Sequence, residues 1–197
     1  MEREPTDLVT QLTREHQDLR LLATAVADAV ATPSGGRRLI DRLAIELSRH
    51  LVAEDCYLLP AITETLADGA TLVRLRQRDR DTLEQRLADL DRPAPDGGPA
   101  PLAALLADLG EHIRNDEAGV LPLLRVDGHP QMLDRRGYLA GADRTEFYRL
   151  IRGGPANRFL CRDRLAPGGT LVERVWRTMA SQRRLGVEPG RPRVSPR

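Results

Sequence analysis

Four segments of the chain carry apolar residues at steps of three and four positions, which is the spacing of an amphipathic helix. They run from Thr6 to about Ala31, from about Arg37 to Leu66, from about Ala70 to Leu90 and from about Pro101 to Leu124. The connections between them contain Gly and Pro, which interrupt helices. The pattern predicts four helices of roughly six turns each, an arrangement that favours an up-down-up-down antiparallel bundle.

The composition agrees with helices rather than with strands. Aromatic residues make up only 3% of the 197 residues, and Ala and Leu dominate the apolar set. Ala and Leu favour helices, whereas sheets are rich in aromatic and β-branched side chains. We therefore predict an all-α protein with a four-helix bundle over residues 6–125 and a partly helical C-terminal extension over residues 126–197.

The helical pattern weakens in the C-terminal extension. Residues 130–137 and 143–152 are each predicted to form a short helix, and residues 171–179 are again amphipathic. The end of the chain, residues 190–197, is rich in Arg and Pro and is predicted to be disordered. The extension contains no catalytic motif.

Several polar residues occupy positions that the helical pattern assigns to the core. His16 lies four residues after Leu12 and three before Leu19, on the inward stripe of the first helix. Burying an unpaired imidazole or carboxylate is costly, so such groups need partners. The candidates on the predicted helices are His16, His50, Glu54, His112 and Glu117. A single buried histidine is usually a hydrogen-bonded core residue. Several histidines and carboxylates aimed at one centre are typical of a metal site inside a bundle.

One stretch of eleven residues, from His50 to Pro60, occurs again in altered form from His112 to Pro122. In both copies two acids follow the His four and five residues on, and a Pro follows it ten residues on. A His and a carboxylate one turn apart lie on the same helix face, where both can reach one metal ion. Two such helices facing each other would form a metal cage.

These motifs resemble those of hemerythrin-like proteins with an HHE cation-binding domain, in particular bacterial ones that carry a C-terminal extension. The matching pieces are residues 13–16, His50 with Glu54 and residues 58–60, and His112 with Glu117 and residues 120–122. The resemblance covers about residues 7–125. It implies a four-helix bundle that binds non-haem iron, as a single ion or a di-iron pair. His16, His50, Glu54, His112 and Glu117 would be the ligands, with both glutamates bridging the metals.

The third predicted helix departs from that family, whose members normally have one or two histidines there. Residues 70–90 contain no His, and the apolar stripe between Val73 and Leu83 is interrupted by charged side chains. Aligning the first and third helices places Arg80 at the position of the missing ligand, and a shift of one residue places Asp79 there. An Asp can bind a hard metal, whereas an Arg stays protonated and cannot.

Three functions from different classes follow. The first is an iron-binding protein that takes part in oxygen or nitric oxide sensing, iron handling or stress response, as the resemblance implies. The second is a metal-free structural or interaction module, in which Arg80 replaces the metal charge by pairing with Glu54 and Glu117. The third is binding of nucleic acid or a protein partner through the basic C-terminal segment around Trp176; a solvated charged face is the commoner explanation of such a segment.

Other features narrow the function further. Thirty Lys and Arg stand against 29 Asp and Glu, so the overall charge demands no polyanionic partner. The first residues lack the apolar core of a signal peptide, and no apolar run approaches the ~20 residues that span a bilayer, so we expect a cytoplasmic protein. Two cysteines, Cys56 and Cys161, are too few for a disulfide framework or a Cys-type zinc site. No catalytic triad, phosphate loop or dinucleotide motif is present, so enzyme activity is not expected.

Overall fold

The structure, a computed structural model, describes residues 6–30, 36–90 and 100–153. Within these ranges every regular element is helical and no strand occurs, which confirms the predicted all-α class. The elements are α1 (Leu8–Val30), α2 (Gly36–Ala53), η1 (Glu54–Leu58), α3 (Leu59–Thr65), α4 (Gly69–Asp89), α5 (Ala100–Asn115), η2 (Asp116–Val120), α6 (Leu121–Asp127) and α7 (Pro130–Gly153). Here η1 and η2 are single π-helical turns.

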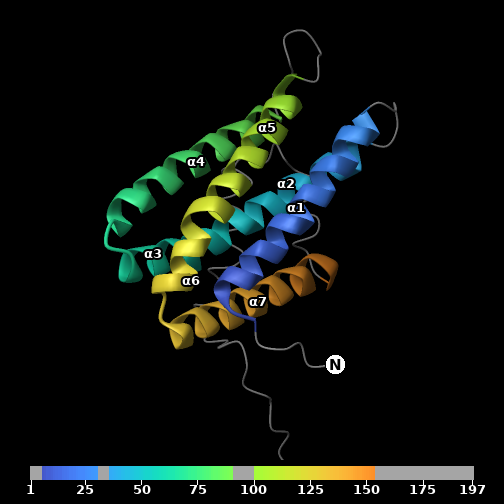
Figure 1. Ribbon diagram of the computed structural model, residues 1–197. Helices are drawn as coiled ribbons and strands as arrows, with labels where there is room; N and C mark the ends of the chain where they lie inside the picture. The colour runs from blue at the N-terminus through green and yellow to red at the C-terminus, as the bar shows by residue number, and fades with distance from the viewer. Residues whose placement is uncertain (1–5, 31–35, 91–99, 154–197) are drawn as a thin grey trace, which may run out of the picture.

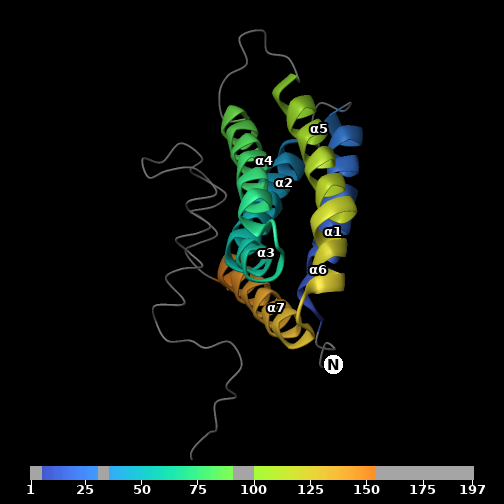
Figure 2. The same ribbon diagram turned by 60° about the vertical axis from the view of Figure 1, so that its left-hand side comes forward.

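The helices form an antiparallel bundle with one further helix across its end (Figure 1). The second long helix consists of α2, η1 and α3, and the fourth consists of α5, η2 and α6. Contacts run from α1 to α2, from α3 to α4, from α4 to α5, and from α1 to α5 and α6, which closes the ring. Figure 2 shows the same bundle from another side, with α7 lying obliquely across its lower end.

Each π-helical turn ends two residues before a proline. The backbone N–H of Leu59 bonds to the carbonyl of Glu54, and that of Leu121 bonds to the carbonyl of Asp116, both five residues back. The prolines that follow, Pro60 and Pro122, therefore begin a new α-helical segment, where a missing N–H leaves no helical bond unmade. The wider turn thus lets each long helix continue past its proline.

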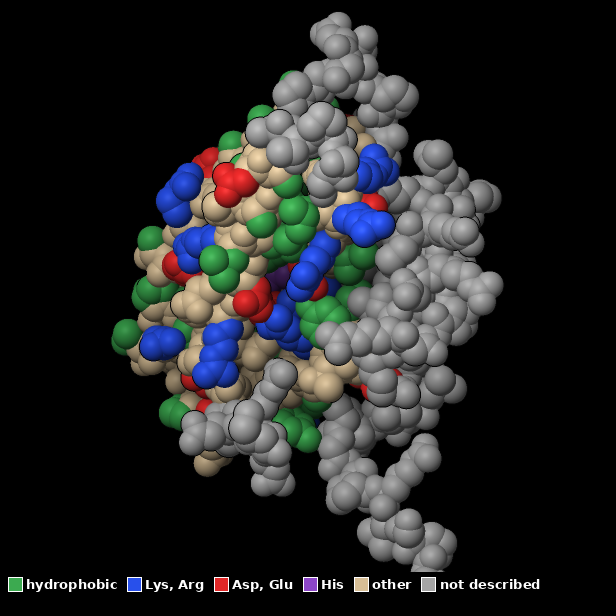
Figure 3. Space-filling view, turned by 90° about the vertical axis from the view of Figure 1, so that its right-hand side faces the viewer, with side chains coloured by type: hydrophobic (Ala, Val, Ile, Leu, Met, Phe, Trp, Pro, Cys, Tyr) green, Lys and Arg blue, Asp and Glu red, His purple; other side chains and the backbone are tan. Residues whose placement is uncertain are grey.

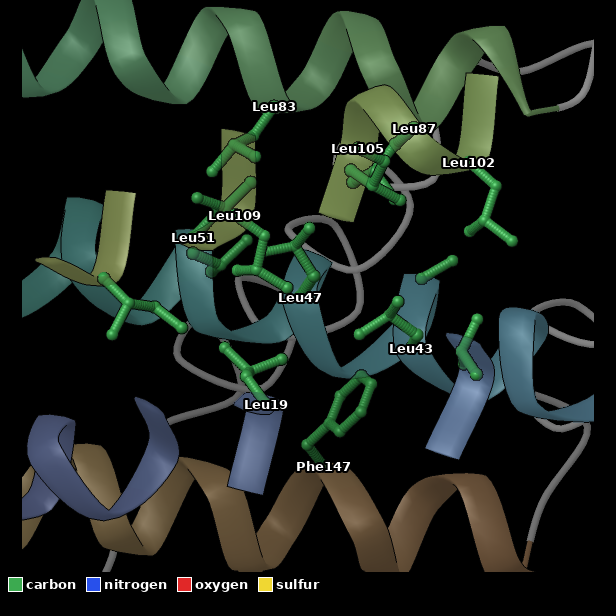
Figure 4. Packing of buried hydrophobic residues seen from close by; sticks show 14 residues of the cluster. Leu19, Leu43, Leu47, Leu51, Leu83, Leu87, Leu102, Leu105, Leu109 and Phe147 are labelled. Atoms are coloured by element: carbon green, nitrogen blue, oxygen red, sulfur yellow. The ribbon is translucent and has the colours of Figure 1, made fainter. Parts of the chain in front are cut away.

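The apolar core is divided into two clusters. The first contains Leu19, Leu43, Leu47, Leu51, Leu83, Leu87, Leu105 and Leu109, and Figure 4 shows how these side chains interdigitate. The second contains Leu8, Leu12, Leu58, Ala61, Ile62, Leu121 and Leu124. In α1 the first cluster includes Leu19 and the second includes Leu12, with the buried His16 between them. The polar residues of the bundle therefore form a layer between two apolar layers.

The C-terminal extension begins with one long helix rather than two short ones. The prediction of separate helices at 130–137 and 143–152 is wrong, because α7 runs without a break and packs along α1 and against η1. Its Phe147 is only 1% exposed and points from α7 into the first cluster (Figure 4). Leu133 of α7 belongs to the second cluster. The apolar core thus extends beyond the boundary predicted at residue 125.

Because α7 packs closely on α1, replacing two different glycines of α7 with Ala should have different effects on stability. A Cβ at Gly137 would overlap the backbone of Thr6 and Asp7, whereas at Gly141 the nearest atom is Oε1 of Gln11, at 3.9 Å. We expect Gly137→Ala to lower the free energy of unfolding by about 1–3 kcal/mol through this overlap. Gly141→Ala, the matched control, should be neutral or stabilising by up to about 1 kcal/mol. Urea unfolding of both variants checks this, and equal effects would contradict the close packing.

Some predictions concern residues outside the described ranges. They are the loop at 91–99, the amphipathic segment 171–179, the basic segment around Trp176, Cys161 and the end at 190–197. Among the helices that the structure does describe, none combines the length and the apolar character that a membrane span requires.

Candidate metal centre

Four buried side chains meet in the polar layer of the bundle. His16 comes from α1, His50 from α2, Glu54 from η1 and His112 from α5. One potential ligand atom from each lies within 4.8 Å of all the others. The Oε1 atom of Glu54 is 3.2 Å from Nε2 of His50 and 3.3 Å from Nε2 of His112. The three imidazole rings stand nearly edge to face, with centroids 4.8 to 6.0 Å apart.

Many polar atoms at this centre have no hydrogen-bond partner. They are Nδ1 and Nε2 of His16, Nε2 of His50, Oε1 of Glu54, Nδ1 and Nε2 of His112, and Oδ2 of Asp116. Leaving a buried donor or acceptor unpaired costs about 1–3 kcal/mol each, so native proteins rarely do so without a reason. A metal ion bound by imidazole nitrogens and a carboxylate oxygen supplies that reason, and these donors suit iron or zinc.

The acid that faces the centre from the fourth helix is Asp116. Its side chain is fully buried, and Oδ2 lies 3.8 Å from Nε2 of His112 and 3.9 Å from Nε2 of His16. The predicted ligand Glu117 lies at the rim instead, where Arg20 binds its carboxylate through two hydrogen bonds of 2.8 and 2.6 Å. Its Oε1 is 3.3 Å from Nδ1 of His16. Glu117 therefore contacts His16 from the edge of the centre, while Asp116, the first residue of η2, is buried beside it. The assignment of Glu117 as a ligand stays a prediction.

A second layer of charged groups holds His50. Oε2 of Glu15 accepts a hydrogen bond of 3.0 Å from Nδ1 of His50, which leaves Nε2 facing the centre. Oε1 of Glu15 accepts hydrogen bonds of 2.9 Å from both Arg49 and Gln11. Such a carboxylate orients an imidazole and raises its basicity as a ligand. Glu15 is fully buried, and Arg49 compensates its charge.

The same layer connects the centre with α7. Arg49 lies 3.5 Å from Oε2 of Glu46, and the hydroxyl of Tyr148 donates a short hydrogen bond to the same carboxylate oxygen. Arg144 pairs with Asp18 of α1 at 2.6 Å and stacks on the ring of Tyr148, with 5.8 Å between its guanidinium carbon and the ring centroid. A chain of charge contacts therefore runs from the surface of α7 through Arg49 to His50.

The third long helix, α4, presents arginines to this region. Arg76 donates a hydrogen bond of 2.5 Å to Oδ1 of Asp116 and pairs with Asp79 at 2.7 Å. Arg80 pairs with Asp55 at 2.9 Å and with Glu84 at 2.6 Å. The predicted pairing of Arg80 with Glu54 and Glu117 is therefore wrong, and Asp79 does not reach the centre. The helix register places Arg76 beside the centre, one turn before both residues that the sequence alignment considered.

The charges at the centre shift the pKa of each group. Burial lowers the pKa of His50, but Glu54 and Glu15 outweigh it and raise the pKa to about 9. Burial and the neighbouring His50 lower the pKa of His16 to about 3. Burial and Glu54 raise the pKa of Asp116 to about 7. Without a metal ion, protons therefore occupy part of the centre, and a bound metal must displace them.

The surface near the centre carries both charged and apolar side chains. Figure 3 shows Arg side chains interspersed with Asp, Glu and hydrophobic side chains on one face, with a small area of histidine visible in a gap between them. His16 and His50 are fully buried and His112 is 3% exposed. A ligand that approaches the centre must therefore be small.

Four residues of this site were not identified from the sequence: Asp116, Arg76, Glu15 and the ion-pair partner of Glu15, Arg49. The repeat contained the signal for Asp116, because Asp116 follows His112 by four residues as Glu54 follows His50. Both copies also form the same π-helical turn at the same position. The sequence contained no signal for the partners of Arg76 and Arg49, because long side chains can reach in several directions.

A family model described as the hemerythrin HHE cation binding domain matches residues 7–124 of the chain. The matched range contains all four side chains of the centre and both π-helical turns. No curated protein and no solved structure matches the chain.

Proposed function

The chain belongs to the hemerythrin family of HHE cation-binding domains, and on that premise we propose that it binds non-haem iron and serves as a binding protein rather than an enzyme. The family and the geometry together support a hemerythrin-like protein with a cluster of His and Glu that can bind a metal ion.

One observation supports metal binding above all others. Oε1 of Glu54 lies 3.2 Å from Nε2 of His50 and 3.3 Å from Nε2 of His112, and all three atoms are buried without a well-formed hydrogen bond. Ligand atoms that share one ion at 2.0–2.2 Å lie roughly 2.8–3.6 Å apart, depending on the coordination number. The residues present therefore fit a metal ion without rearrangement of the helices.

The donor set is compatible with iron, and we propose iron because the resemblance to hemerythrin-like proteins implies it. Three imidazoles and a carboxylate suit iron, zinc and copper, and the absence of thiolate donors makes the centre less soft than Cys-type sites. Four protein ligands also leave coordination positions for a small molecule such as dioxygen or nitric oxide. Iron would supply the chemistry of gas binding or redox change, and the protein would hold it in a nearly closed site. Sensing, iron handling and stress response are all compatible with such a centre.

The second function, a metal-free module, receives less support. Its central feature was a guanidinium of Arg80 between Glu54 and Glu117, whereas Arg80 pairs with Asp55 and Glu84. Among the described residues, the basic neighbours of Oε1 of Glu54 are the imidazoles of His50 and His112, and no guanidinium neutralises it. A degenerate site would be expected to pair this oxygen or to replace Glu54 with an apolar residue.

The metal content of the protein tests the proposal. Protein from cells grown in iron-replete medium is expected to hold about one iron or more per chain, and a bound ion should raise the Tm by about 5–10 °C at a hundredfold excess over Kd. Zn(II) binds most protein sites more tightly than Fe(II), so zinc added in vitro can displace iron. The metal content of the protein as isolated from cells is therefore the decisive measurement. Less than about one iron per five chains, with no thermal shift on anaerobic addition of Fe(II), would contradict iron binding.

A second arm of the experiment addresses the role. Fe(II)-loaded protein exposed anaerobically to nitric oxide is expected to gain visible absorption, because an open position at iron binds the gas. Protein without metal serves as the control. An unchanged spectrum of the loaded protein would argue against gas sensing and leave iron handling as the role.

A further inference from the structure

We propose that Arg76 limits this centre to a single metal ion by occupying, beside Asp116, the space that a second ion would need. The inference rests on the proposed function and deepens it, because it states how many ions the site holds. Its evidence comes from the contacts of α4, the helix in which the chain has no histidine ligand.

The position of Arg76 is well defined by its partners. Nη1 lies 2.5 Å from Oδ1 of Asp116, and Nη2 lies 2.7 Å from Oδ2 of Asp79. The side chain is 13% exposed, so most of the guanidinium is enclosed by the bundle. Asp116 therefore has one oxygen bound to Arg76, while its other oxygen is unpaired and faces His16 and His112.

The donors around the centre come from three of the four long helices, and a second ion would find no ligand on α4. The candidate group within the described residues contains three imidazoles and Glu54, and none of its members comes from α4. Two ions bridged by carboxylates lie about 3.5–4 Å apart and each needs its own ligands from the surrounding helices. The acids nearest on α4 are already engaged, Asp79 with Arg76 and Glu84 with Arg80.

The charge balance leads to the same conclusion. With Asp116 ionised, Glu54 and Asp116 contribute two negative charges at the centre, of which Arg76 neutralises one, and Glu117 at the rim is neutralised by Arg20. One divalent ion would leave the buried site with a single positive charge, whereas two would leave three. Buried charges without compensation are costly, and a guanidinium cannot lower that cost by losing its proton. A second ion would also face the guanidinium directly.

The number of bound ions tests the inference. Full-length, metal-free protein is titrated anaerobically with Co(II), and the stoichiometry is measured by native mass spectrometry and by the visible bands of Co(II). The wild-type chain should saturate at one ion. In Arg76→His, a neutral imidazole replaces the guanidinium and frees Oδ1 of Asp116, so a second, weaker ion should bind. Arg80→Gln is the matched control, because Arg80 lies one turn away and has no contact with Asp116.

Each outcome has a distinct meaning. One ion in the wild type and in Arg80→Gln, with two in Arg76→His, supports the role of Arg76. Two ions in the wild type, or one ion in a folded Arg76→His, would overturn it while metal binding stands. No ion in the wild type would overturn the proposed function itself. The EPR of the oxidised iron form gives an independent check on the wild type, since an isolated high-spin ferric ion has a signal that an oxo-bridged pair lacks.

Discussion

His112→Ala is expected to lower the affinity for Fe(II) or Co(II) by more than about 100-fold. Removing a residue that only orients a ligand costs about 10–100-fold in affinity, and the loss of a direct ligand should exceed that. His112 presents an unpaired Nε2 to the centre from α5, with Glu54 at 3.3 Å, and an Ala leaves no donor in its place. Titration of metal-free protein with Co(II), or calorimetry, measures the change.

The fourth histidine of the chain provides the control for this experiment. His129 is exposed, lies between α6 and α7 and has no contact with the centre. His129→Ala removes an imidazole of the same chemistry and should leave the metal affinity unchanged within about twofold. Equal losses in both variants would mean that the metal binds by nonspecific contact with histidines and not at the buried centre.

Arg49→Met is expected to lower the free energy of unfolding of the metal-free protein by about 3–5 kcal/mol, because it leaves the carboxylate of Glu15 buried without a compensating guanidinium. Both side chains are almost completely buried, and they are joined at 2.9 Å. A change of that size lowers the Tm of a protein of this length by roughly 6–20 °C. Urea unfolding followed by circular dichroism measures it.

The double variant Arg49→Met with Glu15→Gln distinguishes the cost of the uncompensated Glu15 charge from the cost of losing the packing of the Arg49 side chain. A neutral amide can still accept a hydrogen bond from Nδ1 of His50, but it carries no charge that needs compensation. We therefore expect the double variant to recover much of the stability that the single variant loses. If both variants are equally unstable, the loss arises from the packing of the Arg49 side chain and not from an unpaired charge.

The helical bundle was largely predictable because its signal is local. A stripe of apolar residues repeated every 3.6 positions determines both the element and its buried face, whatever the partner helix. The same reasoning placed His16, His50, Glu54 and His112 inside the bundle, and the structure brings these four together. The single long helix α7 was less visible, because its apolar stripe is weak and its contact with α1 depends on small residues such as Gly137.

The periodicity of apolar residues could not decide which of two adjacent acids, Asp116 or Glu117, is buried at the centre. Asp116 and Glu117 point in different directions from the helix axis, so Asp116 is buried beside His16 and His112, whereas Glu117 reaches His16 from the rim. The π-helical turn η2 directs Asp116 inward and leaves Glu117 to Arg20 at the rim. Comparison of the two repeats would have identified Asp116, since it corresponds to Glu54, whereas the resemblance to the family pointed to Glu117.

The sequence by itself determined that four amphipathic helices carry three histidines and a glutamate toward a common centre, because periodicity and residue type are properties of the chain alone. The tertiary structure decided which charged side chains complete that centre. Arg76, Asp79 and Arg80 lie within little more than one turn of α4, and their long side chains can each reach several partners. Only the packing of α4 against α2, α3 and α5 places the guanidinium of Arg76 on Asp116 and that of Arg80 on Asp55.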